Sequence, residues 1–465
     1  MIAGFLITMG TLGDRIGRRR LLMVGAVAFG VASVLAAYST SPAMLIAARA
    51  ALGVAGATLM PSTLALIRNM FLDPQQRGFA IAVWMSAFTG GAALGPAVGG
   101  FLLQWFWWGS VFLLGVPVMA LLLVVGPLVL PEYRKPGAER LDLLSAVLSL
   151  AAILPLVYGL KGLASQGLAA GPLAGLAVGA VFAAVFTRRQ LTLTDPLLDL
   201  RLFRNRGFSS ALGVMLVSTL SMGGMFMLIA QYLQLVAGLS PLESGLLLVP
   251  PSVAMIVSTL SAPAIAQRIG HGNVIGGGML IAALGFGLLT QADPTGAPML
   301  AITGQLVAAV GLGPGAALLA GIIIGSTPKE KAGSAAAISE TSGELGMALG
   351  VALLGSIATA VYRMQITLPT DTPPEAAEAT QEGLSGAVST SETLPAALGN
   401  NLLDTAREAF TQGMTLSAGT AAGATLLLGV LAVFFLRNIE PASHDEDENN
   451  GGAQSAHEEA AAPPT

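Results

Sequence analysis

The sequence contains no cysteine, and it has only three histidines in 465 residues. The absence of cysteine excludes disulfides, a thiolate nucleophile and a cysteine-ligated metal. The histidines lie far apart at His271, His444 and His457, so we expect no metal centre built from them. Charged residues make up only 10% of the chain, whereas an average soluble domain has about 25%. The chain is therefore not expected to fold as a soluble domain.

Two further signatures are missing. No glycine-rich loop ends in Gly-Lys-Ser or Gly-Lys-Thr, the arrangement that holds phosphates in ATP-driven proteins. The basic residues are spread over many short segments instead of forming one patch, which argues against nucleic-acid binding. We therefore expect neither an enzyme nor a protein with a cofactor or metal.

Apolar residues dominate instead, at 54% of the chain. Many windows of about 20 residues carry no charge, and this length spans a bilayer core. They predict an all-α polytopic membrane protein with thirteen spans, near residues 1–12, 20–38, 43–67, 78–103, 109–130, 141–160, 170–187, 208–236, 243–266, 273–291, 297–324, 333–361 and 412–436. The first range is too short to cross and is expected to be the end of a longer helix. Either the start codon was assigned too late or the gene is truncated.

The distribution of positive charge predicts the topology. When the segments between spans are assigned alternately to two sides, 18 of the 22 Lys and Arg residues fall on one side. Lys161, Arg363 and Arg407 fall on the other side, and Arg49 lies within a span. The positive-inside rule makes the first side cytoplasmic, which also places the C-terminus in the cytoplasm.

Linker composition divides the chain into four expected parts. These are an N-terminal helical bundle (1–131), a two-helix insert with cytoplasmic linkers (132–206), a C-terminal bundle with an outside loop at 362–411 (207–437), and a disordered acidic tail (438–465). A short amphipathic helix is expected in the outside loop near residues 402–410.

A short charged turn lies between the first two apolar ranges. Its glycines let two helix ends approach closely, and its carboxylate can accept hydrogen bonds from a helix N-terminus or an arginine. The residues concerned are Gly10, Asp14, Arg15, Gly17, Arg18 and Arg19.

Arg49 is the only basic residue assigned to the interior of a span. A guanidinium in lipid costs a few kcal/mol or more, so it should face a cavity or a partner. Two readings remain open: Arg49 senses the protonation of a carboxylate or binds substrate, or it caps the carbonyl groups of a neighbouring helix.

A glycine-rich segment follows at Gly91, Gly95, Pro96, Gly99 and Gly100. Gly91, Gly95 and Gly99 recur every four residues, so they share one helix face. This face predicts a smooth groove for a neighbouring helix. Pro96 removes one backbone donor and is expected to bend the span.

Glu340 and Glu344 are four residues apart in an otherwise apolar range, so they share one helix face. A span that starts near residue 333 places them roughly 10–17 Å deep, close to the bilayer midplane. Two neighbouring carboxylates in a low dielectric do not both ionise easily, so we expect at least one to hold a proton near neutral pH. Such a pair suits a proton carrier, although a structural pair hydrogen-bonded to serines and backbone remains an alternative.

These motifs resemble those of one membrane protein family. Residues 10–20 read G-x-L-G-D-R-x-G-R-R-R and resemble the loop between helices 2 and 3 of the major facilitator superfamily. Residues 91–100 read G-x-x-x-G-P-x-x-G-G and resemble its antiporter motif in helix 5. The stretch from Arg49 resembles its arginine-glycine motif in helix 4, with Leu52 where glutamine is common. The run from Trp107 and the spacing of Glu340 and Glu344 are similar to the fourteen-helix drug:proton antiporters, which include quaternary-ammonium efflux pumps.

The resemblance implies two six-helix bundles plus a two-helix insert, with the first helix missing. It implies a monomeric antiporter of the inner (cytoplasmic) membrane that exports lipophilic and, we expect, cationic drugs or antiseptics in exchange for protons, driven by the proton gradient alone. The Asp14 turn would form the cytoplasmic gate, and Arg49, Glu340 and Glu344 would couple proton and substrate. The alternatives are a dedicated metabolite or antibiotic exporter of the same superfamily and a truncated, non-transporting membrane remnant or scaffold.

Overall fold

The computed structural model describes residues 2–71, 73–134, 142–167, 169–193, 196, 198–295, 297–327, 332–369 and 371–436. Within these ranges the regular structure is helical throughout, as predicted. The N-terminal helices are α1 Ile2–Ile16, α2 Arg18–Ala37, α3 Pro42–Met70, α4 Pro74–Trp105, α5 Ser110–Leu113 and α6 Gly115–Val129. The insert consists of α7 Leu143–Gln166 and α8 Ala170–Thr192.

The second half begins with a short 3-10 helix and contains one π-helix. Its elements are η1 Leu200–Arg204, α9 Arg206–Gln231, the π-helix η2 Tyr232–Val236, α10 Pro241–Leu247, α11 Val249–Ile269, α12 His271–Leu289, α13 Pro298–Gly325, α14 Ala332–Gln365, α15 Pro374–Glu382, α16 Leu384–Ser391 and α17 Ala396–Leu436.

Local sequence explains where several helices begin. Ser41 and Asp73 accept hydrogen bonds from the backbone N–H groups of Met44 and Gln76, and a proline follows each of these caps. α10 begins with a capping box, in which Ser240 and Glu243 each accept from the other's backbone N–H. Such caps satisfy N–H groups that lack an intrahelical partner, and they fix where the chain turns.

Eleven of the described helical stretches are long and apolar enough to cross a membrane, and they coincide with eleven of the thirteen predicted ranges. The other two predicted ranges correspond to α1, which has 15 residues, and to α4, a helix of 32 residues that contains Pro96. At about 1.5 Å per residue α1 is shorter than the roughly 30 Å of a bilayer core.

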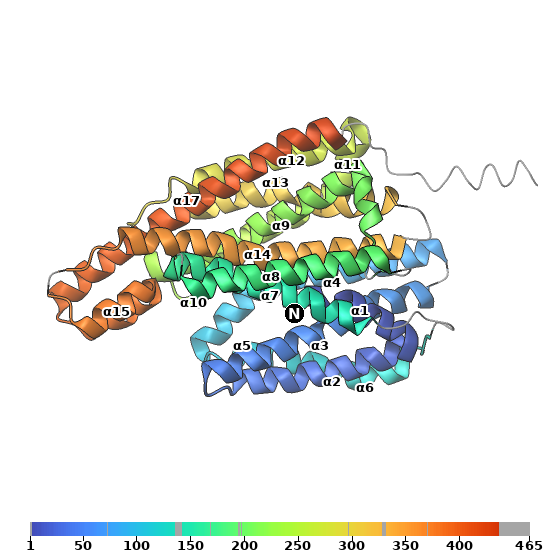
Figure 1. Cartoon of the computed structure of the whole chain (residues 1–465), viewed down its shortest axis with the longest axis horizontal. Helices are drawn as coiled ribbons and strands as arrows, with labels where there is room; N and C mark the ends of the chain where they lie inside the picture. The colour runs from blue at the N-terminus through green and yellow to red at the C-terminus, as the bar shows by residue number, and fades with distance from the viewer. Residues whose placement is uncertain are drawn as a thin grey trace, which may run out of the picture.

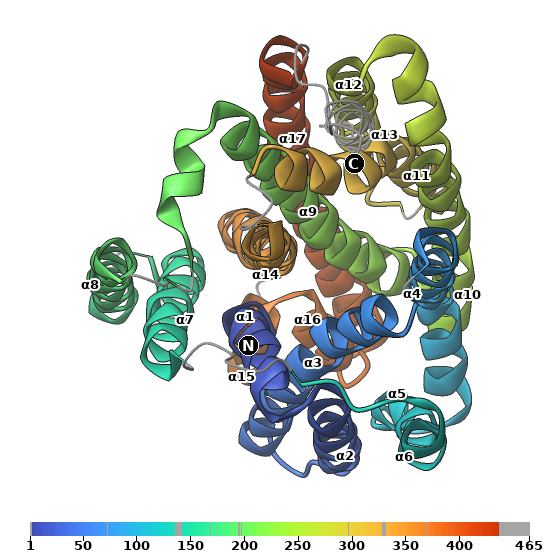
Figure 2. The same cartoon turned by 90° about the vertical axis from the view of Figure 1, so that its right-hand side faces the viewer.

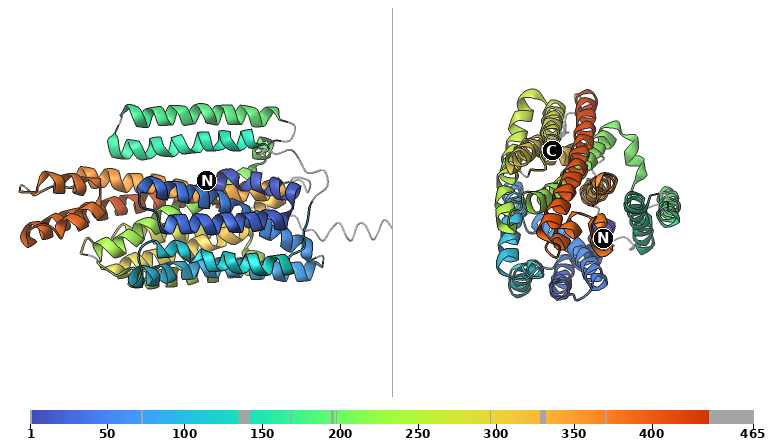
Figure 3. Two further views of the ribbon diagram at one scale, coloured as in Figure 1. Left: turned by 90° about the horizontal axis from the view of Figure 1, so that it is seen from below. Right: turned by 90° about the vertical axis from the view of Figure 1, so that its left-hand side faces the viewer.

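The helices pack into two groups with the insert beside them. In the first group α2 packs against α3 and α6, and in the second α9 packs against α14 while α12 packs against α13 and α17. The groups meet where α1 contacts α14 and where α4 contacts α10 and α11. Figure 2 shows α14 near the centre of the molecule, beside α1, α7 and α9. α7 contacts both α1 and α14, and α8 packs outside α7 (Figure 3).

The segment predicted as an outside loop, 362–411, is largely helical in the structure. α14 has 34 residues and α17 has 41, which correspond to about 51 and 61 Å of helix. Their ends and the short helices α15 and α16 protrude at one end of the molecule (Figure 1). The segment is rich in alanine and glutamate, which favour helix, and Leu384 and Ala387 are buried within it. The amphipathic helix expected near 402–410 is part of α17. The predicted tail, 438–465, lies outside the described residues.

Candidate functional site

The charged turn joins α1 to α2 at Gly17, whose φ of 114° favours glycine. Arg18 folds back on α1, and its Nη2 lies 2.7 Å from Oδ1 of Asp14. Arg18 is buried at 8% exposure, and a Cβ at Gly13 would lie 3.0 Å from its Cδ. Gly13 therefore leaves the room that the Arg18–Asp14 ion pair occupies.

Arg19 and Arg20 both lie close to Glu132, a residue outside the charged turn. The Nε atoms of Arg19 and Arg20 lie 3.8 and 3.7 Å from Oε2 of Glu132, which follows α6. Arg15 is exposed. Glu132 lies in the predicted linker after residue 131, and the sequence predicted no role for it.

Arg49 lies in the second turn of α3, and its guanidinium carbon is 5.9 Å from the ring centroid of Phe112. Phe112 in turn makes an edge contact with Trp108, at 6.3 Å between ring centroids. Among the described residues no carboxylate pairs with Arg49, and none of the described contacts joins it to Glu340 or Glu344. The structure therefore gives Arg49 a cation–π partner in place of a carboxylate.

The glycine-rich segment of α4 packs on a different face from the predicted one. A Cβ at Gly91, Gly95 or Gly99 would meet no atom within 4 Å. The prediction that these three glycines form a groove for a neighbouring helix is therefore wrong for the described structure.

α4 contacts a neighbouring helix, α10, through the adjacent face, which carries Pro96 and Gly100. A Cβ at Gly100 would lie 2.9 Å from Cα of Leu242, and a Cβ at Gly245 would lie 3.0 Å from Cα of Ala97. Pro96, Gly100 and Gly245 thus lie where α4 of the first helix group touches α10 of the second. Since each residue advances about 100° round a helix, the face of Pro96 and Gly100 differs from the face of the other three glycines.

Glu340 and Glu344 lie on α14, as the ninth and thirteenth residues of that helix. The neighbouring helix α9 covers an adjacent face of α14: Met215 accepts a hydrogen bond from Ser339, and Gly346 fits against Thr219. At about 100° per residue, Glu340 and Glu344 are rotated by roughly 100° and 140° from Ser339 around the helix axis. Glu340 is exposed and Glu344 is partly exposed, so the two lie on an open side of α14.

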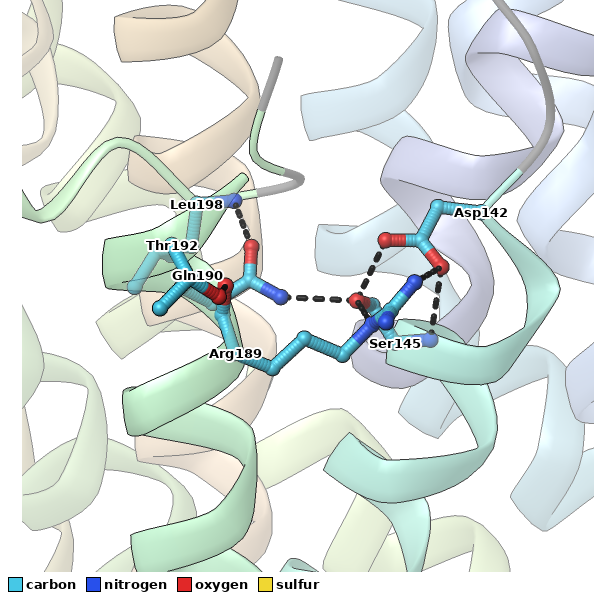
Figure 4. Close-up of polar contacts among 6 residues, drawn as sticks. All are labelled: Asp142, Ser145, Arg189, Gln190, Thr192 and Leu198. Atoms are coloured by element: carbon cyan, nitrogen blue, oxygen red, sulfur yellow. Dashed lines mark hydrogen bonds and ion pairs between the residues drawn. The ribbon is translucent and has the colours of Figure 1, made fainter. Parts of the chain in front are cut away.

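A polar network at one end of the insert was not predicted. Arg189 on α8 donates to Asp142 at 2.9 Å and to the hydroxyl of Ser145, and Gln190 donates to the same hydroxyl at 2.7 Å (Figure 4). The side-chain oxygen Oε1 of Gln190 accepts the N–H of Leu198, and the hydroxyl of Thr192 donates to the backbone carbonyl oxygen of Arg189. This network joins both helices of the insert to the chain that leads into η1.

Burial raises the pKa of Asp142, but the hydrogen bonds from Ser145 and the charge of Arg189 outweigh it, so the pKa lies below the usual range. Asp142 is therefore ionised at neutral pH. The sequence signal that could have found it is a helix-capping aspartate directly before an apolar run.

Two groups of membrane-length helices, with helix contacts between the groups and an additional helix pair, define an integral membrane protein with the architecture of a transporter. The model of the Major Facilitator Superfamily matches residues 1–351. The chain belongs to this superfamily, as its motifs predicted.

Curated relatives support this assignment over most of the chain. The multidrug efflux pump LfrA of Mycolicibacterium smegmatis is 42% identical over 433 residues, covering 93% of this chain and 86% of that protein. The methyl viologen resistance protein SmvA of Salmonella typhimurium is 36% identical, covering 95% and 89%. The tetracenomycin C resistance and export protein of Streptomyces glaucescens is 33% identical, covering 96% and 84%.

Solved structures share the fold at low sequence identity. A peptide transporter, POT, in complex with sulfate superimposes with a TM-score of 0.59 at 16% identity, covering 94% of this chain and 85% of that one. A bacterial homolog of the human lysosomal transporter Spinster gives a TM-score of 0.59 at 17% identity, covering 94% and 87%.

Proposed function

We propose that this protein is a proton-coupled antiporter that exports lipophilic cationic compounds across the cytoplasmic membrane, with its C-terminus in the cytoplasm. The observation that carries the proposal is the placement of Glu340 and Glu344 on the open side of α14. α14 also touches α1 of the first helix group, so the pair lies on a helix that takes part in the contact between the two groups. The efflux and resistance functions of LfrA and SmvA agree with it.

The chemistry requires no cofactor. A carboxylate of the pair binds a proton from the outer side and becomes neutral. After the two helix groups change their relative tilt, the carboxylic acid releases that proton inside, and the carboxylate is free to hold a lipophilic cation. Proton and cation thus compete for the same group, so one is carried only after the other has left.

Other parts of the fold would serve this exchange. The Asp14–Arg18 pair holds the turn between α1 and α2, where we place the cytoplasmic gate. The close backbone approach of α4 and α10 would hold the helix groups together on the outer side. Arg49 would act from its cation–π contact with Phe112 and not through a carboxylate. We propose that the protein works as a monomer, is not an enzyme and binds no nucleic acid.

The test is ethidium-driven proton release from proteoliposomes that contain the purified full chain. Glu340→Gln and Glu344→Gln should each abolish proton release while the protein stays in the membrane. Glu378→Gln is the matched control, since Glu378 is an exposed glutamate on the short helix α15, which is not one of the membrane-length helices. If both single variants exchange at the wild-type rate, the assignment of the proton site is wrong.

A second candidate is the export of a dedicated natural product. It is favoured by relatives from Streptomyces, such as the tetracenomycin C resistance and export protein and the puromycin resistance protein pur8. This candidate would be established if the wild-type protein released no protons in response to ethidium but exchanged protons for one aromatic antibiotic in a compound screen.

A further inference from the structure

The N-terminus of α2 has no side-chain cap of its own. Its cap position is Gly17, which has no side chain. The first N–H groups of a helix lack intrahelical partners, and in most helices a polar side chain at the cap position accepts one of them. At α2 this role must be filled from elsewhere in the chain.

The segment that follows α6 fills it. The N–H of Arg18 donates to the carbonyl oxygen of Tyr133 at 2.9 Å, and the N–H of Arg19 donates to Oε1 of Glu132 at 3.1 Å. Glu132 lies 113 residues beyond Arg19 in the sequence. The carboxylate also meets the positive end of the helix dipole, which favours a negative charge at this position.

The side chains of the arginines reinforce the same contact. The Arg19 guanidinium donates to the carbonyl oxygen of Leu130 at 3.0 Å while its Nε lies 3.8 Å from the Glu132 carboxylate. The Glu132 side chain is 27% exposed and that of Arg19 is 33% exposed, so the pair is partly withdrawn from water. Arg20 is 72% exposed and adds a weaker, screened attraction.

The contact between Glu132 and the start of α2 requires glycine at position 17. A Cβ at Gly17 would overlap the Glu132 carboxyl group, whose Cδ would lie 2.7 Å away. Glycine is therefore required at this position for two reasons: its φ of 114° is unfavourable for other residues, and a side chain would block the Glu132 carboxylate.

We propose that Glu132 is a positioning residue of the cytoplasmic gate, which it fixes by capping α2 from the end of the neighbouring helix α6. The inference rests on the proposed transport function. Arg18 holds the turn to α1 through Asp14, and Glu132 holds the same turn to the end of α6, so the turn is fixed from two sides. Since the N–H groups of Arg18 and Arg19 donate to Tyr133 and Glu132, the gate turn and the start of the linker to the insert are held together.

The experiment compares the full-length wild type with Glu132→Gln, Glu132→Asp and the control Arg134→Gln in proteoliposomes, with ethidium as the probe. Arg134 is exposed and lies two residues from Glu132. We expect Glu132→Gln to lower the maximal exchange rate at least tenfold with the KM for ethidium changed less than twofold. Glu132→Asp should recover part of the rate, and Arg134→Gln should match the wild type.

Hydrogen exchange of the backbone amides of residues 18–20 is measured on the same proteins. Glu132→Gln should speed their exchange at least tenfold and leave the amides in the middle of α2 unchanged. A normal maximal rate in Glu132→Gln would overturn the gate role, and unchanged amide exchange would overturn the cap. If Glu132→Gln does not accumulate, Glu132→Asp is used in its place. A maximal exchange rate below that of the wild type then supports the gate role, and faster amide exchange at residues 18–20 supports the cap.

The amide measurement does not depend on transport. A wild type that fails to exchange ethidium for protons would refute the proposed drug:proton exchange, and the amides would still decide whether Glu132 caps the gate turn.

Discussion

The contact between α4 and α10 makes the sharpest prediction about how the two helix groups move. In the variant Gly100→Ala the new methyl group would lie 2.7 Å from the backbone carbonyl carbon of Pro241 and 2.9 Å from Cα of Leu242. Carbon atoms prefer a separation of about 3.5–4.0 Å, so the helices must move apart by roughly 1 Å. Both obstructing atoms belong to the backbone, so no side-chain rotation can relieve the overlap.

Overpacking of this kind costs about 1–3 kcal/mol. If the strain is present only while α4 and α10 touch, it shifts the equilibrium between the two arrangements of the helix groups by about 5- to 150-fold away from the one described here. Gly245→Ala, which overlaps Ala97 from the other side of the same contact, should act in the same direction. Gly277→Ala is the matched control, because a Cβ there meets no atom within 4 Å.

The assay uses the absence of cysteine from the chain. A single cysteine in place of Ala97, beside the contact, should react with a water-soluble maleimide several-fold faster in Gly100→Ala than in the parent, and the Gly277→Ala background should match the parent. Equal labelling rates in all three proteins would show that the close backbone approach does not hold the helix groups together, and the reasoning from Gly100 would fail.

Two further predictions concern the insert and the protruding helices. The lowered pKa of Asp142 gives stability that is fully present above the ordinary aspartate value of 3.8 and is lost as the pH falls through the folded-state pKa. Asp142→Asn should therefore lower the thermal midpoint of the purified protein at pH 7 and remove that part of the acid sensitivity below about pH 4. An unchanged pH profile would contradict the network in Figure 4. Arg407 on α17 donates to the carbonyl oxygen of Leu235 in η2 at 3.2 Å. Arg407→Gln removes this charge-assisted hydrogen bond, which is worth about 1.5–3 kcal/mol, and should therefore speed amide exchange around η2. Amide protection equal to that of the wild type would show that the bond is not maintained.

The sequence predicted the parts of the fold that depend on local pattern. Uncharged runs marked eleven membrane-length helices, and Gly17 and Asp14 marked the turn between α1 and α2. Periodicity placed Glu340 and Glu344 on one face of α14. In each case the physical cause lies within a few residues of the feature.

Contacts between distant segments were not predictable in this way. Glu132 reaches Arg19 across 113 residues, and nothing near Glu132 in the sequence signals that it caps another helix. The packing face of α4 was assigned to Gly91, Gly95 and Gly99, because spacing shows which residues share a face and not which face meets a neighbour. The helices within 362–411 were missed because a polar, proline-containing segment was read as a loop, although alanine and glutamate favour helix.

The length of α14 has a mechanical consequence. Glu340 and Glu344 lie near its beginning, and the same unbroken helix continues for 21 residues beyond Glu344 to Gln365. Its far end therefore stands about 30 Å from the nearer glutamate. A tilt of about 5° around the carboxylates displaces that end by roughly 3 Å. Through the hydroxyl of Tyr362, which donates to the carbonyl oxygen of Thr380, that displacement passes to α15. α14 thus acts as a lever that pivots at the ionisable pair and whose long arm carries the protruding helices.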